Sequence, residues 1–336
     1  MNSLKNKIIL ITGGTGSFGH EVLKKITTQD FKEVRIFSRD ELKQELMRKE
    51  LNLPKVKFYI GDVRDRGSVD NAMKGVDIVF HAAALKQVPT CEFFPMQAVL
   101  TNVCGSNNVV ESALNYKVKN LVCLSTDKSV YPINAMGMTK GLMEKILQAY
   151  ARNLGEKDTI LSCVRYGNVM HSRGSVIPLF LKQIKENKPI TVTDPNMTRF
   201  LLPLKSAIDL VFFAFSNAKQ GDIFIKKSPA CSMGNLAIAM KNIFESKVPV
   251  KIIGIRHGEK IYETLATREE LIKSQDFRDY LRIKMDIRGL NYDKFYSEGD
   301  KRESVINDYT SHNTQRLTVK EIEKLLLSLP EIRKEL

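Results

Sequence analysis

Short apolar runs alternate with amphipathic stretches through the first half of the chain. The runs are almost continuously apolar, as expected for parallel strands that are buried on both faces. We predict strands at Lys7–Thr12, Glu33–Ser38, Val56–Ile60, Ile78–Ala82, Asn120–Ser125 and Thr159–Tyr166. The stretches between them predict helices at Phe18–Thr27, Glu41–Leu51, Ser68–Met73, Met96–Asn115 and Met136–Asn153. This alternation predicts an α/β fold with a doubly wound parallel sheet.

The alternation weakens after about Tyr166, where Pro and Gly become frequent. We predict two domains, residues 1–168 and residues 169–336, with the second a smaller α/β lobe whose segments interleave with the first. The charged stretch Arg268–Lys301 is predicted to be a mobile surface excursion. Thr318 is the expected N-cap of a last helix, with Glu321 completing a capping box. The helices expected here are Val176–Glu186, Ser206–Ala218, Met233–Phe244 and Leu317–Ser328.

Charge and cysteine content exclude several classes of protein. The net charge of the 336 residues is +14, but Lys and Arg are spread along the chain and no block of like charges indicates nucleic-acid binding. A small polyanion, such as a nucleotide diphosphate, would suit a basic protein. Five cysteines without CxxC spacing predict free thiols and no metal site. Without a signal peptide or a long apolar stretch, we expect a cytoplasmic protein that does not enter membranes.

Glycines 13, 16 and 19 follow the first strand and open the first helix. Gly13 would allow the tight turn, Gly16 the close approach of a pyrophosphate, and Gly19 the packing of helix on strand. The anion would lie on the N–H groups at the helix start, beside Thr15, Ser17 and Phe18. The motif predicts a dinucleotide site in a doubly wound parallel Rossmann sheet. Its GxxGxxG spacing resembles that of short-chain dehydrogenases/reductases.

Ser38 and Arg39 end the second strand, where an NAD enzyme usually carries a carboxylate for the ribose 2′-hydroxyl. A guanidinium would instead pair with a 2′-phosphate. We therefore predict NADP as the cofactor, with NAD as the less favoured alternative.

Further cofactor residues are implied by the resemblance to short-chain dehydrogenases/reductases. Asp62 and Val63 after the third strand resemble the contact to the adenine. The small residues Ala82, Ala83 and Ala84 resemble the segment beside the nicotinamide ribose, and Asn102 extends the similarity into the following helix.

The fifth strand leads into Thr126, Asp127 and Lys128. Short-chain dehydrogenases carry Ser or Thr here and Tyr-x-x-x-Lys on the next helix, where the Lys lowers the Tyr pKa. Lys140 occupies the Lys position, but Met136 stands at the Tyr position. A thioether cannot exchange protons, so the usual base is absent. Asp127 as acid and Lys128 as base would instead suit the 4,6-dehydration of a hexose, which a simple 4-epimerase does not perform.

These motifs resemble the inverting, 5-epimerising UDP-N-acetylglucosamine 4,6-dehydratases of capsule and O-antigen synthesis over nearly the whole chain. The segments that carry the resemblance include FSRDE, FYIGDVRD, HAAALKQVPTCE, LSTDKSVYPINAMG, RYGNVMHSRGSVIP, MTRF and YTSHNTQRL. Relatives named capsular UDP-glucose 4-epimerases share almost all of them, and this branch also carries Met at the Tyr position. The acceptor of the C4 hydroxyl proton stays open between Lys128, Asp127 and water.

The resemblance also implies a UDP-sugar substrate held mainly by the second lobe. Arg199 and Arg256 would clamp the diphosphate because guanidinium groups match phosphate geometry. Glu259 would accept from the uridine ribose. The remaining expected substrate contacts are Lys86, Tyr166 and Asn168.

Two other functions remain as alternatives. One is a UDP-glucose or UDP-GlcNAc 4-epimerase, and the other is a dinucleotide-sensing regulator that has lost catalysis. The resemblance further implies a homo-oligomer, from dimer to hexamer, in which Met96–Asn115 and Met136–Asn153 pack against their copies.

Overall fold

A nine-stranded sheet forms the centre of the molecule. The computed structural model describes residues 4–172, 174–286 and 307–336. The strand order is β13-β14-β9-β6-β5-β4-β1-β2-β3, and the seven strands from β9 to β3 are parallel. The six strands expected from the first half are all present: β1 (Ile8–Thr12), β2 (Glu33–Ser38), β3 (Val56–Ile60), β4 (Ile78–His81), β5 (Asn120–Leu124) and β6 (Ile160–Arg165).

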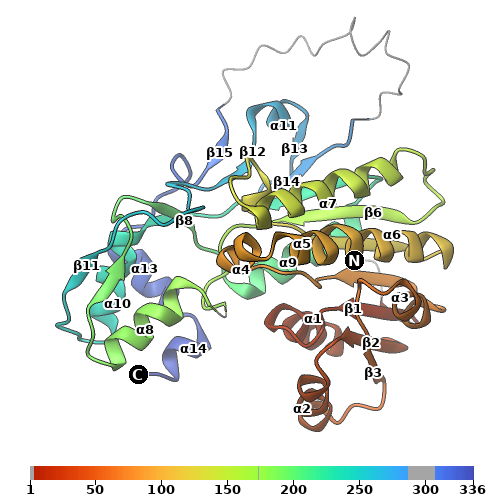
Figure 1. Ribbon diagram of the computed structural model, residues 1–336, viewed down its shortest axis with the longest axis horizontal. Coiled ribbons are helices and arrows are strands. Elements are labelled where there is room, and N and C mark those ends of the chain that lie inside the picture. Colours follow the sequence, from red (N-terminus) through yellow and green to blue (C-terminus); the bar gives the residue numbers. More distant parts are fainter. Residues whose placement is uncertain (1–3, 173, 287–306) are drawn as a thin grey trace, which may run out of the picture.

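Helices cover both faces of this sheet (Figure 1). On one face α1 (Ser17–Thr27), α2 (Glu41–Leu51) and α9 (Leu204–Asn217) share a core with Ile9, Ile36 and Phe80. On the other face α3 (Arg66–Met73), α6 (Gly105–Asn115) and α7 (Ala135–Ala151) pack over Leu10, Val79 and Leu121. The doubly wound Rossmann sheet predicted from the sequence is thereby confirmed.

A smaller lobe has its own hydrophobic core and lies at the left of Figure 1. Phe180, Met240 and Ile322 are central to this core and come from three different helices. Its helices are α8 (Val176–Lys185), α10 (Met233–Ile243), α13 (Val319–Leu327) and α14 (Pro330–Arg333). Two short strand pairs complete it: β7 (Ile190–Val192) with β11 (Val250–Ile252), and β8 (Thr198–Phe200) with β10 (Ala230–Ser232). Thr318 caps α13 in a capping box with Glu321, as predicted.

The second half of the chain also completes the large sheet. Strand β9 (Asp222–Lys226) pairs with β6, and β14 (Tyr280–Ile283) and β13 (Ser274–Asp276) extend the sheet beyond it. The prediction of a surface excursion at Arg268–Lys301 is therefore wrong for its first part, because α11 (Arg268–Ile272), β13 and β14 lie there and Leu281 and Ile283 are buried. Residues 287–301 of that prediction lie outside the described residues. Strand β12 (Thr264–Ala266) pairs separately with β15 (Tyr309–Thr310).

The helix expected at Met96–Asn115 is divided in the structure. It comprises α5 (Pro95–Ala98), a π-helical segment η1 (Val99–Cys104) and α6, and it is preceded by α4 (Val88–Phe93). Among the described residues, no helix has the length and apolar character needed to cross a membrane.

Candidate cofactor and active site

The glycine loop between β1 and α1 leaves no room for side chains at two of its three predicted positions. Gly13 has a φ of +65°, and a Cβ there would lie 2.8 Å from the backbone nitrogen of Ala83. A Cβ on Gly19 would lie 2.3 Å from the backbone oxygen of Gly14. Gly14 is restricted as well, since its Cβ would lie 2.8 Å from Ile36 Cγ2. At Gly16 a Cβ would meet only the Gly13 oxygen, at 3.3 Å.

The first turn of α1 offers backbone N–H groups to an anion. Gly16 is the N-cap residue, no described side chain caps the helix, and the first turn carries no acidic residue. Thr15 is half-buried and Ser17 is exposed beside these donors. A helix start with free N–H groups attracts negative charge. The loop and the helix therefore fit the pyrophosphate of a dinucleotide.

Two arginines meet one carboxylate at the ends of β2 and β3. Arg39 Nη1 lies 3.3 Å from Asp62 Oδ2, and Arg64 Nη2 lies 2.6 Å from the same oxygen. Burial alone would raise the pKa of Asp62, but hydrogen bonds from Arg64 and the charge of Arg39 hold that pKa below its ordinary value. Ser38 is buried, and its hydroxyl accepts a hydrogen bond from Gln44. Sequence reasoning did not single out Arg64, although it belongs to the FYIGDVRD motif.

The other predicted cofactor residues line or support the same edge of the sheet. Phe18, in the first turn of α1, stacks on Tyr166 with ring centroids 6.1 Å apart. The backbone N–H groups of Ala82 and Ala83 donate to Thr12 Oγ1, and Ala84 follows half-buried. Val63 is a buried core residue.

Asn102 is fully buried and joins three segments. Its side chain accepts from the Leu85 N–H and donates to the Leu85 carbonyl and to Thr139 Oγ1. These bonds fix the segment after β4 against α7, so Asn102 supports the site in the structure.

Lys140 and Met136 lie on the first two turns of α7. Lys140 is buried, its ammonium donates to the Leu124 carbonyl at 2.8 Å, and burial lowers the pKa of its amine. Met136, at the position predicted to correspond to the Tyr of the Tyr-x-x-x-Lys motif, packs with Cys91 and Ala98. Met136 therefore fills an apolar contact and offers no exchangeable proton.

Asp127 and Lys128 occupy a 3-10 turn, η2 (Asp127–Ser129), which begins three residues after the last residue of β5. Asp127 is fully buried, and its Oδ1 accepts from Lys128 Nζ at 3.0 Å and from Thr126 Oγ1 at 2.9 Å. Lys128 Nζ also lies 3.2 Å from Oε1 of Glu263, which sequence reasoning missed. Burial alone would lower the pKa of Lys128, but the charges of Asp127 and Glu263 raise it above its ordinary value.

A network of ion pairs and hydrogen bonds connects η2 to α7 and to the end of β6. Ser129 donates to Glu144 on α7, and Arg165 at the end of β6 binds both Glu144 and Glu270. The hydrogen bonds between these four side chains are 2.6–3.0 Å long. Opposite charges at this distance in a buried site fix their elements relative to one another.

The predicted substrate residues divide into a group beside η2 and a group farther out. Arg199 Nε lies 3.8 Å from Glu263, and its Nη2 lies 3.6 Å from Glu259. Arg256 is exposed and pairs with Glu259 at 3.5 Å. Lys86 is exposed after β4.

Tyr166 and Asn168 follow β6, beside the same turn. The carbonyl of Tyr166 accepts from the Asp127 N–H, and burial raises the pKa of the Tyr166 hydroxyl. No described residue pairs with the buried side-chain oxygen of Asn168.

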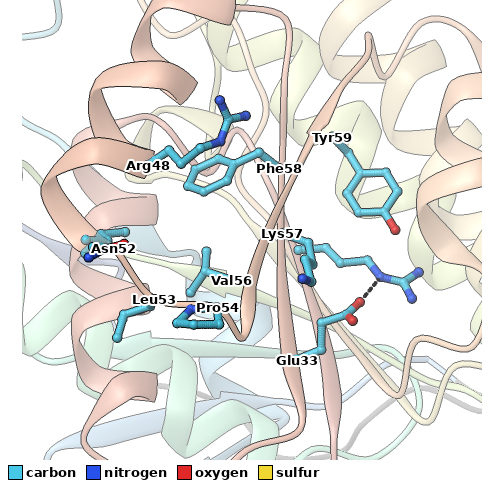
Figure 2. Close-up of a pocket in the computed structure, with 11 residues that line it drawn as sticks. Glu33, Arg48, Asn52, Leu53, Pro54, Val56, Lys57, Phe58 and Tyr59 are labelled. Carbon is cyan, nitrogen blue, oxygen red and sulfur yellow. Dashed lines mark hydrogen bonds and ion pairs between the residues drawn. The ribbon is translucent and has the colours of Figure 1, made fainter.

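A pocket of about 670 Å³ lies elsewhere, against the edge strand β3 and the end of α2 (Figure 2). Glu33 there pairs with Arg35 at 2.6 Å, and Arg48 lies over the ring of Phe58. Glu33 and Val56 begin their strands, so this pocket is at the opposite end of the sheet from η2. The pocket therefore lies apart from the candidate site. The described residues contain no cluster of His, Cys, Asp or Glu suited to a metal ion.

The sheet order and the glycine loop define a protein with a Rossmann-type fold. The chain belongs to the polysaccharide biosynthesis protein family, which matches residues 9–285, and the C-terminal region of that family matches residues 286–333.

The similar proteins include a named epimerase and, among solved structures that share the fold, a named dehydratase. The UDP-glucose 4-epimerase of Rickettsia conorii is 57% identical over 335 residues, covering 98% of each chain. Among solved structures, Pen from Bacillus thuringiensis is 37% identical with a TM-score of 0.87, covering 97% of this chain and 99% of that one. DesIV, a dTDP-glucose 4,6-dehydratase from Streptomyces venezuelae, is 18% identical with a TM-score of 0.69 over 76% of this chain and 86% of that one, and so shares the fold.

Proposed function

We propose that the protein is an NADP-dependent UDP-GlcNAc 4,6-dehydratase that inverts C5 and serves surface polysaccharide synthesis. The observation that carries the proposal is the ion pair between buried Asp127 and half-buried Lys128 at the carboxyl end of β5, with Met136 in place of a proton-exchanging Tyr. Ligands bind at the carboxyl ends of strands in open α/β sheets, so this pair faces the expected sugar position.

The cofactor would be held by the elements that fit it. The Gly13–Gly19 loop and the start of α1 would bind the pyrophosphate, and Arg39 with Arg64 would bind a 2′-phosphate. Lys140 would contact the nicotinamide ribose. Bound NADP would supply the hydride acceptor for C4 and the hydride donor for C6, so the reaction needs no external oxidant. Lys128, Asp127 or water would take the proton of the C4 hydroxyl.

Asp127 and Lys128 would then carry the proton transfers of the elimination. The C5 proton becomes acidic once C4 is a ketone. Lys128 would remove it as the free amine that forms when its ammonium proton passes to Asp127, 3.0 Å away. Asp127 in its protonated form would assist loss of the C6 hydroxyl as water. Arg199 and Arg256 would bind the diphosphate of the substrate, and Glu259 its uridine ribose. Return of the C5 proton to the opposite face would give the inverted 4-keto-6-deoxy sugar.

The test is incubation of the purified protein with UDP-GlcNAc, followed by mass spectrometry for loss of one water. Lys128→Ala should abolish exchange of the C5 hydrogen with deuterated solvent. Asp127→Asn should slow water loss by about 10²–10⁴-fold, the contribution of a general acid, while cofactor binding is retained. Wild-type exchange at C5 in Lys128→Ala would show that another group is the base.

A UDP-sugar 4-epimerase is the second candidate, because curated relatives at 57% identity carry that name. Conversion of UDP-GlcNAc to UDP-GalNAc without loss of water would establish this candidate and refute the dehydratase.

A further inference from the structure

The ammonium group of Lys128 lies between two buried carboxylates that come from different parts of the chain. Asp127 Oδ1 is 3.0 Å away on the same turn, and Glu263 Oε1 is 3.2 Å away, just before β12. The side chains of Asp127 and Glu263 are 1% and 3% exposed, whereas that of Lys128 is 21% exposed. The lysine is thus the only one of the three that reaches solvent appreciably.

Glu263 has no other role visible among the described residues that would explain its burial. Its backbone N–H donates to Ser311 Oγ, and its carbonyl accepts from the Ser311 N–H, so the backbone is fixed independently of the side chain. Its Oε2 is buried with no hydrogen-bond partner among the described groups. A buried carboxylate is costly unless opposite charges face it. Those charges are Lys128 at 3.2 Å and Arg199 at 3.8 Å.

The charged groups around Lys128 come from four segments. Asp127 lies on η2, Glu263 before β12, Arg199 on β8, and Lys260 in the loop that precedes Glu263. Lys260 Nζ donates to the Val130 carbonyl, and burial lowers the pKa of its amine. Tyr166 faces Asp127 from the end of β6. Loss of Glu263 would therefore leave one carboxylate, that of Asp127, among three cationic side chains.

We propose that Glu263 is a positioning residue that holds the Lys128 ammonium in the site and sets the pH at which Lys128 becomes a free amine. The proposal rests on the proposed function insofar as Lys128 acts as the C5 base. Two carboxylates keep the lysine charged in the resting protein. Arg199, which also contacts Glu263, is expected to bind the substrate diphosphate, so substrate binding would alter the charge around Glu263 and Lys128 together.

The test measures the protonation of Lys128 directly. Trace acetic anhydride modifies only the unprotonated amine, and mass spectrometry of the Lys128 peptide over a pH series, against an added reference amine, gives the midpoint. In Glu263→Gln the midpoint should fall by roughly 1–3 pH units, the usual effect of one neighbouring opposite charge. Glu263→Asp, whose carboxylate is retracted, should give an intermediate midpoint. The pH at which the rate of C5 hydrogen exchange rises should also be highest in the wild-type protein, intermediate in Glu263→Asp and lowest in Glu263→Gln.

Glu259→Gln is the matched control. Glu259 contacts Arg199 at 3.6 Å but does not contact Lys128, so its loss should raise KM and leave the Lys128 midpoint unchanged. Lys128 midpoints in the Glu263 variants that equal the wild-type midpoint would overturn the proposal. If Glu263→Gln does not fold, the midpoint of Glu263→Asp is the deciding measurement. Acetylation requires no turnover. If the wild-type protein fails to dehydrate UDP-GlcNAc, the proposed function is refuted while the midpoints still decide the role of Glu263.

Discussion

His81 is enclosed between two hydroxyl groups at the end of β4. Its Nδ1 lies 2.7 Å from Thr12 Oγ1, and its Nε2 lies 2.8 Å from Ser106 Oγ. Burial, together with the charge of Lys140, lowers the pKa of His81 to about 3. The imidazole therefore stays neutral in the folded protein and fixes β1, β4 and α6 next to the glycine loop.

This neutral histidine should make stability depend on pH. In the unfolded chain His81 takes up a proton below a pKa of about 6.5, whereas the folded protein resists protonation down to about 3. The unfolded state binds more protons in that window, so stability falls as pH falls, by up to about 1.4 kcal/mol per pH unit. We expect His81→Gln to have a lower free energy of unfolding than the wild-type protein at pH 7. Between pH 6.5 and 5, its free energy of unfolding should fall by about 2 kcal/mol less than that of the wild-type protein. Urea unfolding at both pH values measures this, and parallel losses in the two proteins would contradict it.

Arg39 provides a test of cofactor choice at the residue scale. It is half-exposed beside Asp62, where a 2′-phosphate would find the guanidinium groups of Arg39 and Arg64. Arg39→Asp should shift preference from NADP toward NAD by about 1–3 kcal/mol, the value of a charge-assisted hydrogen bond. Lys49→Asp, an equal charge change on the exposed end of α2, should leave the preference unchanged. Equal affinities of the wild-type protein for the two cofactors, measured by calorimetry, would contradict the assignment.

The residues that sequence reasoning found are those with a fixed local spacing. Gly13 and Gly19 could be predicted because a turn and a close helix contact demand glycine within one segment. Glu263 and the Glu144–Arg165 pair could not, because their contacts join segments that only the folded sheet brings together. The sequence around Glu263 contains nothing that indicates its contact with the amine of Lys128.

At the scale of elements, α7 packs against η2 through glycine. A Cβ on Gly137 would lie 2.2 Å from the Lys128 carbonyl oxygen, so the helix touches the backbone of the turn that carries Asp127 and Lys128. The lack of a side chain at this position sets the distance between the two elements. The tight packing also keeps Lys140, one turn later, within reach of the Leu124 carbonyl.

Gly137→Ala should therefore displace the turn. We expect a loss of about 1–3 kcal/mol in unfolding free energy, as for other overpacked sites, together with lower kcat. Gly67→Ala is the control, because its Cβ would meet only Asp65 Oδ1 at 3.6 Å. That change within α3 should stabilise the protein by about 0.5–1 kcal/mol through helix propensity. Equal stability of the two variants in thermal unfolding would show that the structure around Gly137 accommodates a methyl group without loss of unfolding free energy.

Residues 95–115 are divided into α5, η1 and α6, and the π-helical segment η1 could not be predicted from the apolar periodicity. The apolar spacing is helical throughout, so the sequence predicts one helix from Met96. The π-helical turn adds a residue within the helix, and Asn102 in that turn binds Leu85 and Thr139. Such a local change in hydrogen bonding depends on partners outside the helix and leaves no trace in its own pattern.

At the scale of the molecule, a large apolar surface lies over α4, α5, η1 and α7. In Figure 1, α4, α5 and α7 lie together, and η1 contacts both α5 and α7. Phe93 is 82% exposed, which is unusual for such a side chain in a protein without a partner. The other exposed members are Phe94, Met96, Leu100, Met138 and Leu142. This surface supports the expectation that the protein forms homo-oligomers through these helices.

Leu142→Glu should therefore weaken self-association. The charge would lie within the proposed interface, where its desolvation is unfavourable. Leu46→Glu places the same charge on α2, where the wild-type leucine is similarly exposed, and should leave the assembly intact. Light scattering at micromolar concentration measures the mass of each. A monomeric wild-type protein, or an unchanged mass for Leu142→Glu, would contradict the proposed interface.

The order of strands in the large sheet has a consequence for synthesis on the ribosome. The strands β1 to β6 emerge first, but β6 gains its second neighbour only when β9 follows, and β14 closes that side later still. Until then the nascent chain presents an unpaired parallel strand, which invites pairing with other chains. When the chain has been made up to the proposed division near residue 168, it contains the whole cofactor-binding loop. The edge of its sheet at β6, however, still lacks the partner strand β9. A protein released there would carry its glycine motif intact and yet be prone to aggregate.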